Sequence, residues 1–285
     1  VDSVRGTQKT LHSNDSTAEL NERHIQSLDE NGFTVDDIDS GTANEDDFTY
    51  VAWCWKAGGP AVTNTDGSLS VQVSANPKAG FSIVRTETTS YNAGTAGHGL
   101  GATPKFIIQK PINATGNWNV QHHLMMTTST GKLLFNSTAG IVTSSTPYMH
   151  NANDTTFEPI FSSNQIAYCW TEIEGYSKFG RYTGTGNTNG PFAYCGFKPA
   201  WVMIKNVTVS KTGHWVIWDS SRTPANLATN ALTADNPMAE TSGFDIDLVS
   251  NGFKMRDTEG SLNTDGDLYI FAAFAESPFQ TATAK

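Results

Sequence analysis

The sequence predicts an all-β protein made of tandem antiparallel β-sandwich domains of jelly-roll-like type, related by an internal repeat. Short apolar segments alternate with turns rich in Gly, Ser, Thr and Asn, a pattern that is typical of sandwiches and barrels. No long segments with the 3.6-residue period of a helix separate them, so a doubly wound α/β fold is not supported. The chain also contains two long stretches that resemble each other, which indicates duplicated domains.

These two stretches are Gly80–Lys110 and Gly175–Lys205, and they align without a gap. Both begin with Gly, an aromatic residue and Ser, continue through a Gly-rich turn, and reach an apolar strand after a Pro that ends the preceding strand. The matched pairs are Phe81 and Tyr176, Gly101 and Gly196, Pro104 and Pro199, Phe106 and Trp201, and Lys110 and Lys205.

The match extends to the end of each copy and also backwards into the N-terminal part. Trp118 matches Trp215, and the closing strand Ile166–Glu172 matches Ile270–Glu276. The N-terminal part aligns as the rear half of another copy, through Asp2–Arg5 with Asp219–Arg222, Asn31–Phe33 with Asn251–Phe253, and Tyr50–Cys54 with Tyr269–Ala273. The chain therefore holds about two and a half copies, and the first lacks its front strands.

This alignment predicts four segments. We call them the N-terminal segment (1–59, the rear half of a sandwich), the connector (60–79), repeat 1 (80–174) and repeat 2 (175–285, including a short polar tail). We expect the missing front strands to precede Val1, although another chain could supply them by strand addition. Val1 is not an initiator Met, so cleavage and an internal starting point both remain open.

In the N-terminal segment, Phe33–Val35 is expected to form a short strand, followed by a long acidic loop over Asp36–Asp47. Phe48–Trp55 is so apolar that we expect a strand covered on both faces. In the connector, Leu69–Val73 alternates apolar and polar residues, which predicts another strand.

Repeat 2 shows its strands most clearly. A hairpin turn is predicted at Asn251-Gly252, where both residues can adopt positive φ, and one helical turn is predicted at Asn226–Leu232. The expected strands are Tyr176–Tyr182, Phe192–Phe197, Trp201–Val207, His214–Asp219, Phe244–Leu248, Phe253–Arg256 and Leu268–Phe274.

Composition excludes some classes of partner. The formal net charge is −10, and nucleic-acid binding needs clustered Lys and Arg, so we expect no nucleic-acid partner. No apolar run approaches the roughly 20 residues of a membrane-spanning helix, so we expect no membrane association.

Carboxylate pairs and motifs were considered for catalysis. No nucleophile elbow, phosphate-binding loop or zinc-protease motif occurs. Glu172 and Glu174 share one face at a strand end, as a glycosidase pair could. Repeat 2 has Glu276 and Pro278 at those places, which favours a solvated strand end. We therefore predict no enzymatic activity, no catalytic residue and no cofactor.

No metal site is predicted either. His122 and His123 are the only adjacent histidines, and a metal would need further ligands, so we expect an exposed strand end there. The Asp36–Asp47 loop offers the oxygen ligands that calcium prefers without the spacing of an EF-hand, so a solvated loop and a calcium-stabilised loop both remain open. Cys54 and Cys169 occupy matched places that hold Ala273 in repeat 2, which indicates small buried positions rather than a disulfide.

Trp218 is the one candidate for a receptor-binding residue. Trp118 and Trp215 are matched across the repeats and are expected to face the core, whereas Trp218 lies on the opposite face of its strand and Gln121 replaces it in repeat 1. Packing against another subunit or domain, contact with a glycan, and ordinary burial are the three interpretations.

Several long phrases carry a family resemblance. The phrases GFSIV, PKFIIQK, EGYSKFG, KPAWVMIKN, GHWVIWD and SNGFKMR resemble a repeat in tail-fibre-like structural proteins of bacteriophages, many of them marine. The N-terminal piece, from DSVRG to YVAWCWKAGG, resembles the segment before those repeats, where a concanavalin- or SPRY-like β-sandwich ends. The resemblance covers nearly the whole chain.

The resemblance implies a virion structural protein, a tail-fibre or surface-appendage component on the exterior of the phage particle that contributes to host attachment by non-catalytic binding. It implies other virion proteins and a cell-surface glycan as partners, and a homo-oligomer, with a trimer preferred because fibres of this family are commonly trimers. Two alternatives remain: a carbohydrate-binding β-sandwich module of a larger secreted protein, and a polysaccharide depolymerase.

Overall fold

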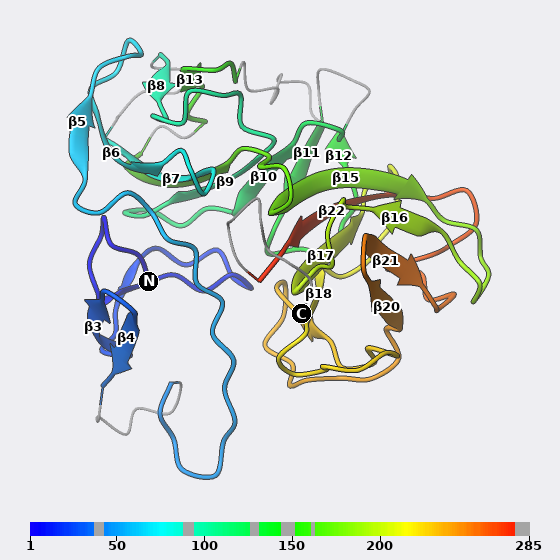
Figure 1. Ribbon diagram of the computed structural model, residues 1–285. Coiled ribbons are helices and arrows are strands. Elements are labelled where there is room, and N and C mark those ends of the chain that lie inside the picture. The colour runs from blue at the N-terminus through cyan, green and yellow to red at the C-terminus, as the bar shows by residue number, and fades with distance from the viewer. Residues whose placement is uncertain (37–42, 88–93, 126–130, 144–151, 161–162, 277–285) are drawn as a thin grey trace.

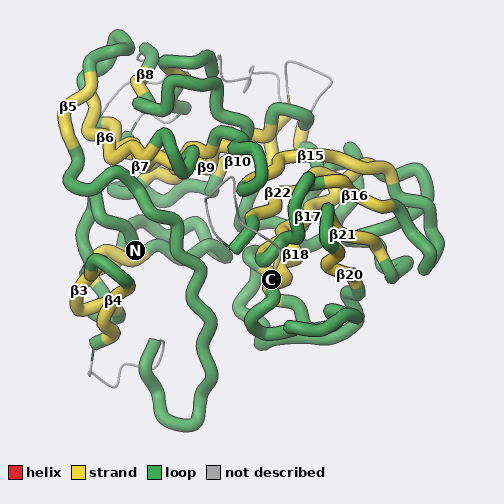
Figure 2. The backbone as a smooth tube through the Cα atoms, viewed as in Figure 1, coloured by secondary structure: helices red, strands yellow, loops and turns green. Residues whose placement is uncertain are grey.

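The computed structural model describes residues 1–36, 43–87, 94–125, 131–143, 152–160 and 163–276. Every regular element among these residues is a β-strand, and all paired strands run antiparallel (Figures 1 and 2). The predicted all-β sandwich class is therefore confirmed. The described part of the chain contains no helix that could cross a membrane.

The largest sheet belongs to repeat 1 and lies at the top of Figure 1. Its strand order is β12-β11-β10-β9-β14-β7-β6-β5. The strands are β5 (Val62–Asn64), β6 (Val71–Asn76), β7 (Phe81–Thr86), β9 (Phe106–Pro111), β10 (Asn119–His122), β11 (Gly131–Leu134), β12 (Val142–Thr143) and β14 (Gln165–Trp170). β5 and β6 come from residues 60–79, so this segment is not a mere connector but extends the sheet of repeat 1.

Repeat 2 forms a sheet with the order β15-β22-β17-β18-β19 and a second sheet with the order β16-β21-β20. The strands are β15 (Ser177–Thr183), β16 (Phe192–Tyr194), β17 (Trp201–Asn206), β18 (Val216–Asp219), β19 (Leu232–Thr233), β20 (Ile246–Val249), β21 (Gly252–Met255) and β22 (Leu268–Phe274). In both repeats the closing strand, β14 or β22, lies between the first two strands of its repeat, β7 and β9 or β15 and β17. The order β7-β14-β9-β10-β11 in repeat 1 equals β15-β22-β17-β18-β19 in repeat 2.

All expected strands of repeat 2 are present, with ends that differ by a few residues. The helical turn predicted at Asn226–Leu232 is wrong. Ala228 forms a bridge with Ile246, and Ala231 forms one with Thr241, so backbone groups that a helix would use internally pair with distant residues instead.

The described residues of the N-terminal segment form only two small antiparallel pairs of strands, coloured blue in Figure 1. β1 (Lys9–Thr10) pairs with β2 (Leu20–Asn21), and β3 (Ile25–Asp29) pairs with β4 (Gly32–Val35). The strand expected at Phe48–Trp55 is not formed, because no described strand lies beside this stretch to accept and donate backbone hydrogen bonds.

Three apolar clusters hold the molecule together. The central cluster takes residues from both repeats, and the N-terminal segment adds Trp53 and Trp55 to it. The second fills the space between the two sheets of repeat 2. The third lies between the sheet of repeat 1 and the small sheet of β8 (Ala96–Gly97) and β13 (Thr156–Phe157). The repeats therefore share a core instead of forming separate domains on a string.

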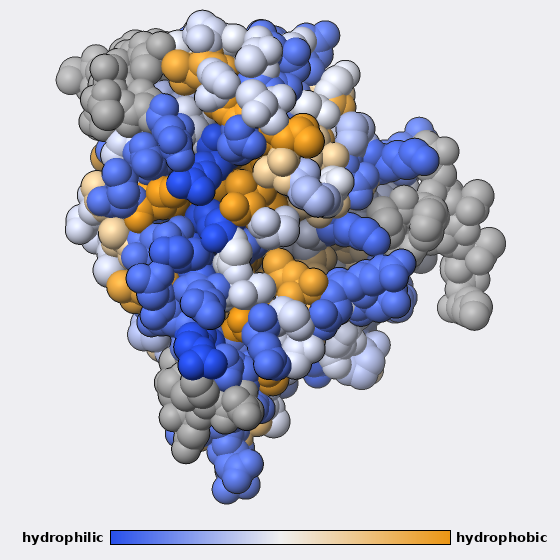
Figure 3. All heavy atoms as spheres, turned by 90° about the vertical axis from the view of Figure 1, so that its left-hand side faces the viewer, coloured by the Kyte–Doolittle hydropathy of each residue, from blue (hydrophilic) through white to orange (hydrophobic). Residues whose placement is uncertain are grey.

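The side of the molecule that carries β3, β4 and β5 exposes apolar side chains in several separate patches among polar ones (Figure 3). Leu28 of β3 is 45 % exposed and Val62 of β5 is 65 % exposed. Scattered exposed apolar residues of this kind are normal for a protein surface.

Candidate functional site

A surface groove lies where repeat 1 meets repeat 2. It consists of two adjoining depressions of about 500 Å³ and about 720 Å³, which share Glu172, Lys178 and Tyr194. The first also takes Lys105 and His123 from repeat 1, and the remaining charged or aromatic lining residues are Glu174, Phe179, Arg181, Phe192 and Phe271. Both signs of charge and several aromatic rings therefore line one open surface.

The aromatic part of the groove comes from β16. Ala193 points into the second core and is buried, whereas Phe192 and Tyr194 on the other face are 45 % and 63 % exposed. β16 is an edge strand held only by β21 on its inner side. Alternation along this strand thus presents two aromatic rings to solvent, which is what a sugar ring stacks on.

The charged part of the groove is partly paired. Lys178 Nζ lies 2.6 Å from Glu172 Oε1, and the backbone N–H of Phe179 donates to Glu172 Oε2 over 3.3 Å. Glu174 is exposed on the rim. Because both oxygens of Glu172 accept hydrogen bonds within the protein, the two glutamates do not form a pair of free carboxyl groups. The arrangement suits recognition of a polar ligand rather than acid–base chemistry.

The two adjacent histidines contact repeat 2, and the expectation of an exposed strand end is wrong for His122. His122 is buried, and its Nε2 lies 3.2 Å from the carbonyl oxygen of Phe271, while its Nδ1 accepts the N–H of Leu124. His123 Nε2 lies 2.9 Å from the carbonyl oxygen of Phe179. Burial lowers the pKa of His122 to about 3, with a smaller contribution from His123. Both nitrogens of a neutral imidazole are thus satisfied without a metal.

This burial predicts a loss of stability at mildly acidic pH. The unfolded chain binds a proton on His122 near pH 6.5, whereas the folded chain binds it only near pH 3, so protonation favours unfolding as the pH falls below 6.5. Between pH 7 and pH 5 this amounts to about 2 kcal/mol. Urea unfolding at pH 7 and at pH 5 measures this difference in the free energy of unfolding. In His122→Gln the difference between the two pH values should be smaller by about 2 kcal/mol.

His98 is also buried with a lowered pKa, so the pH dependence should shrink in His122→Gln without vanishing. An unchanged slope in His122→Gln would show that this imidazole is not held neutral.

Trp218, the candidate receptor-binding residue, is fully buried in the second core. Its indole N–H donates to the carbonyl oxygen of Phe244 over 2.8 Å. The face opposite Trp215 is covered by the sheet of β16, β20 and β21, so ordinary burial is the correct interpretation and a receptor contact is excluded. Cys169 is buried as expected, whereas Cys54 is exposed.

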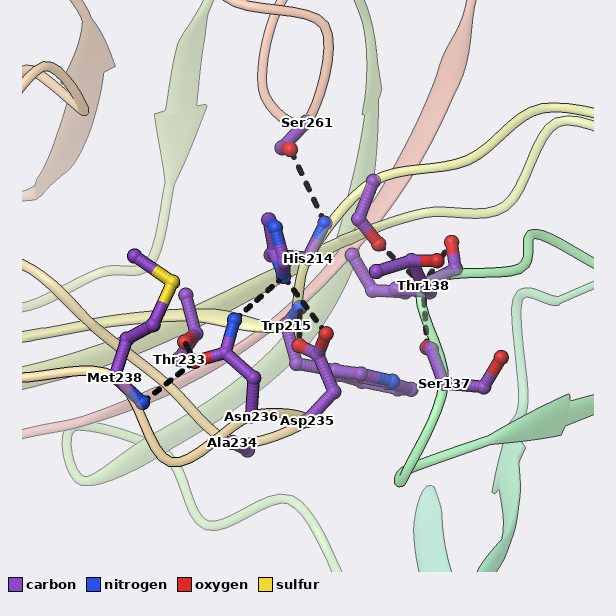
Figure 4. Close-up of polar contacts among 12 residues, drawn as sticks. Ser137, Thr138, His214, Trp215, Thr233, Ala234, Asp235, Asn236, Met238 and Ser261 are labelled. Atoms are coloured by element: carbon purple, nitrogen blue, oxygen red, sulfur yellow. Dashed lines mark hydrogen bonds and ion pairs between the residues drawn. The ribbon is translucent and has the colours of Figure 1, made fainter. Parts of the chain in front are cut away.

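A second polar cluster contains the residue types of a hydrolase triad. His214 Nδ1 lies 2.7 Å from Asp235 Oδ2 (Figure 4). Ser261 Oγ, however, accepts the backbone N–H of His214 over 3.1 Å and does not bond to the imidazole. The serine is therefore not activated by the histidine, and the cluster fixes the backbone around His214 instead.

Metal ligands do not converge in the described part of the chain, where no three His, Cys, Asp or Glu side chains form a cluster. Asp36 is buried, and its Oδ2 lies 3.3 Å from Nε of Arg23. Residues 37–42 of the acidic Asp36–Asp47 loop lie outside the described residues, so the calcium alternative stays a prediction.

The fold and the groove define an all-β protein with an open, aromatic-lined surface site between two sheets. Residues 1–278 match the family described as a domain of unknown function, DUF7483, and the chain belongs to that family. No curated protein and no solved structure matches the chain.

Proposed function

We propose that the chain is a bacteriophage virion structural protein, a tail-fibre or surface-appendage component that contributes to host attachment by non-catalytic binding. The groove between the repeats carries this proposal. Phe192 and Tyr194 offer an aromatic platform, and Lys105, Lys178 and Glu174 around it offer donors and acceptors for hydroxyl groups. The ligand class is a cell-surface glycan.

The architecture supports a passive role. The repeats share the central core, and the buried Lys205 of repeat 2 donates to backbone carbonyls of repeat 1, so the groove is held on a rigid frame. A groove of this openness gives weak binding at each site. Many copies on a particle would convert weak contacts into firm attachment, and closed symmetry is the usual arrangement of such copies. We propose a homo-oligomer, with a trimer preferred.

Removal of the exposed tyrosine ring tests the site. Tyr194→Ala should weaken retention of the protein on host-cell surface glycans about fivefold, because a lost aromatic stacking contact costs about 1 kcal/mol. Tyr194→Phe keeps the ring and should retain most of the binding. Tyr50→Ala removes an exposed tyrosine outside the groove and should bind as the parent chain does. Equal retention of all three variants would refute the groove as the binding site.

The same groove suits a carbohydrate-binding module of a larger secreted protein, which is the second candidate. The exposed pair Phe192 and Tyr194 favours it, since such modules bind sugars through aromatic side chains. The two candidates differ in where the chain is found, either on purified phage particles or attached to a secreted protein. Cleavage of a polysaccharide that is lost in Glu174→Gln would instead support the depolymerase alternative.

A further inference from the structure

The stretch Phe48–Ala57, here called the acceptor strand, shows the alternating burial of a strand from Val51 onwards but pairs with no described strand. Its odd-numbered residues from Val51 to Ala57 are half-buried and its even-numbered residues are exposed. Trp53, Trp55 and Ala57 pack on the central cluster. Among the described residues, no backbone N–H from Thr49 to Ala57 donates to a backbone carbonyl. One face is therefore anchored, and no described strand lies on either edge of Phe48–Trp55, while the carbonyl of Lys56 accepts the side-chain amide of Asn76 over 3.1 Å.

The matched strands show what normally covers such a stretch. β14 lies between β7 and β9, and β22 lies between β15 and β17. Cys169 and Ala273, which match Cys54, are both fully buried, whereas Cys54 is exposed. Phe48 and Tyr50 are 64 % and 50 % exposed. The acceptor strand thus lacks one strand on each edge and a cover for one face.

Successive copies are joined by a buried lysine that binds backbone carbonyls of the copy before it. Lys110 Nζ of repeat 1 donates to the carbonyl oxygens of Ser16 and Thr17 in the N-terminal segment, over 3.2 and 2.7 Å. Lys205 Nζ of repeat 2 donates to those of Ser137 and Thr138 in repeat 1, over 3.1 and 2.9 Å. Each copy therefore offers a short backbone segment to the lysine of the next copy.

The adjacent tryptophans repeat the same joint. The indole N–H of Trp118 donates to the carbonyl of His12 over 2.8 Å, and that of Trp215 donates to the carbonyl of Leu134 over 2.9 Å. The N–H of Gly116 donates to Ser16, as that of Gly213 donates to Thr138. In both junctions, a lysine, a tryptophan and a glycine of one copy thus donate hydrogen bonds to neighbouring backbone carbonyls of the preceding copy.

Repeat 2 offers the equivalent segment at Asn236–Glu240, here called the ledge. Asn136 Oδ1 accepts the N–H of Trp118 just before the segment of repeat 1, and Asp235 Oδ1 accepts the N–H of Trp215 just before the ledge. Asn236 Oδ1 accepts the N–H of Met238 and holds the start of the ledge in place (Figure 4). Asn236 is half-buried and the residues from Pro237 to Glu240 are exposed, Met238 by 57 %, while the carboxylate of Glu240 pairs with Nη1 of Arg222 in the same repeat over 2.8 Å.

The acceptor strand and the ledge belong to the same junction. Asp219 Oδ2 at the end of β18 accepts the indole N–H of Trp53 in the acceptor strand over 3.2 Å. The matched Asp2 accepts the hydroxyl of Tyr168 in β14 over 2.8 Å. Repeat 2 therefore contacts the N-terminal segment in the way that the N-terminal segment contacts repeat 1. In the junction between the N-terminal segment and repeat 1, the front strands of repeat 1 flank β14 and also carry Lys110, which binds the carbonyls of Ser16 and Thr17.

We propose that the acceptor strand and the ledge together bind the front strands of a further repeat, which carry a lysine and a tryptophan at the positions of Lys205 and Trp215. The occupant that fits is polypeptide of this kind joined directly before Asp2, as the contacts of Asp2 indicate. Asp2 accepts the N–H groups of Val4 and Arg5 and the Nε–H of Arg5, as Asp219 does from Ser221 and Arg222. Asp219 is the last residue of β18, so the chain entering Asp2 takes the place of that front strand.

A second copy of the chain does not supply the strands. Its Lys110 and Lys205 already hold the segments of their own chain, and its front strands already flank β14 and β22. The acceptor strand needs a strand on each edge at once, which edge-to-edge contact of two copies does not provide.

Thiol reactivity and a grafted chain test the proposal. In the chain from Val1 to Lys285, Cys54 should react quickly with a thiol reagent, while the buried Cys169 and Cys195 react slowly. A longer chain carries an extra copy of residues 175–218 directly before Asp2, with the cysteine of that copy changed to alanine. In it, Cys54 should react about 100-fold more slowly, and the melting temperature should rise.

A second extended chain tests whether the lysine of the added copy is needed to protect Cys54. The same extended chain, with the lysine of the extra copy changed to glutamate, should lose most of the protection of Cys54. The proposal is overturned if Cys54 stays equally reactive in the folded extended chain. It is also overturned if Cys54 is already protected in the parent chain through self-association, because a second copy would then be the occupant.

Discussion

Replacement of Lys205 by methionine is expected to lower the free energy of unfolding by about 3–5 kcal/mol. The ammonium group is fully buried and donates to the carbonyl oxygens of Ser137, Thr138 and Gly213. Burial lowers its pKa to about 8, so it still carries its proton at pH 7. Methionine fills the same space but removes the ammonium donor from the carbonyls of Ser137 and Gly213, while that of Thr138 keeps only the N–H of Gly213.

Urea unfolding at pH 7 measures this effect. Lys198→Met, at an exposed lysine of the same repeat, is the control and should change stability by less than about 0.5 kcal/mol. Lys110→Met should behave like Lys205→Met, since it removes the matched joint. A loss of under 1 kcal/mol in Lys205→Met would show that the lysine does not hold the repeats together.

Trp201→Ala should destabilise the protein by about 3–5 kcal/mol, which is typical of removing a buried tryptophan. Its ring packs edge-on against Trp53 and Trp55 of the N-terminal segment, with centroids 6.1 and 5.4 Å away, and lies 5.6 Å from Phe274. The substitution removes one of the main apolar contacts between the N-terminal segment and repeat 2. Thermal and urea unfolding both report it.

Trp201→Phe is the matched control, because repeat 1 has Phe106 at the equivalent place. The indole N–H of Trp201 is buried without a hydrogen-bond partner, so phenylalanine also removes an unsatisfied polar group. We expect this variant to lose less than half as much stability as Trp201→Ala. Equal losses would indicate that ring volume at this position is not what matters.

The sequence was a good guide to strands whose partners lie in the same repeat. The segments of repeat 2 from β15 to β22 show alternating or continuous apolar residues between Gly- and Asn-rich turns, and all form. Phe48–Trp55 has the same apolar pattern and does not form a strand. An apolar pattern reports which residues can be buried, whereas a ladder also requires neighbouring strands, and those are supplied by other parts of a chain.

The site was harder to predict. Alternation along β18 predicts that Trp218 lies on the face opposite Trp215, and the structure confirms this. The sheet of β16, β20 and β21 covers that face, and alternation along one strand carries no information about a second layer. Phe192 and Tyr194 alternate with the buried Ala193, a signal that was present in the sequence. The groove beside them also needs Lys105 and His123 of repeat 1 next to β15. This is a contact between distant parts of the chain, which alternation along one strand does not predict.

The most direct test of the proposed function is quantitative mass spectrometry of purified phage particles whose genome encodes this chain, combined with antibody labelling of intact particles. The proposal predicts peptides of the chain in a constant ratio to the major virion proteins, and label on the outside of the particle. Absence of the chain from purified particles, with recovery in the culture medium as part of a secreted protein, would contradict it.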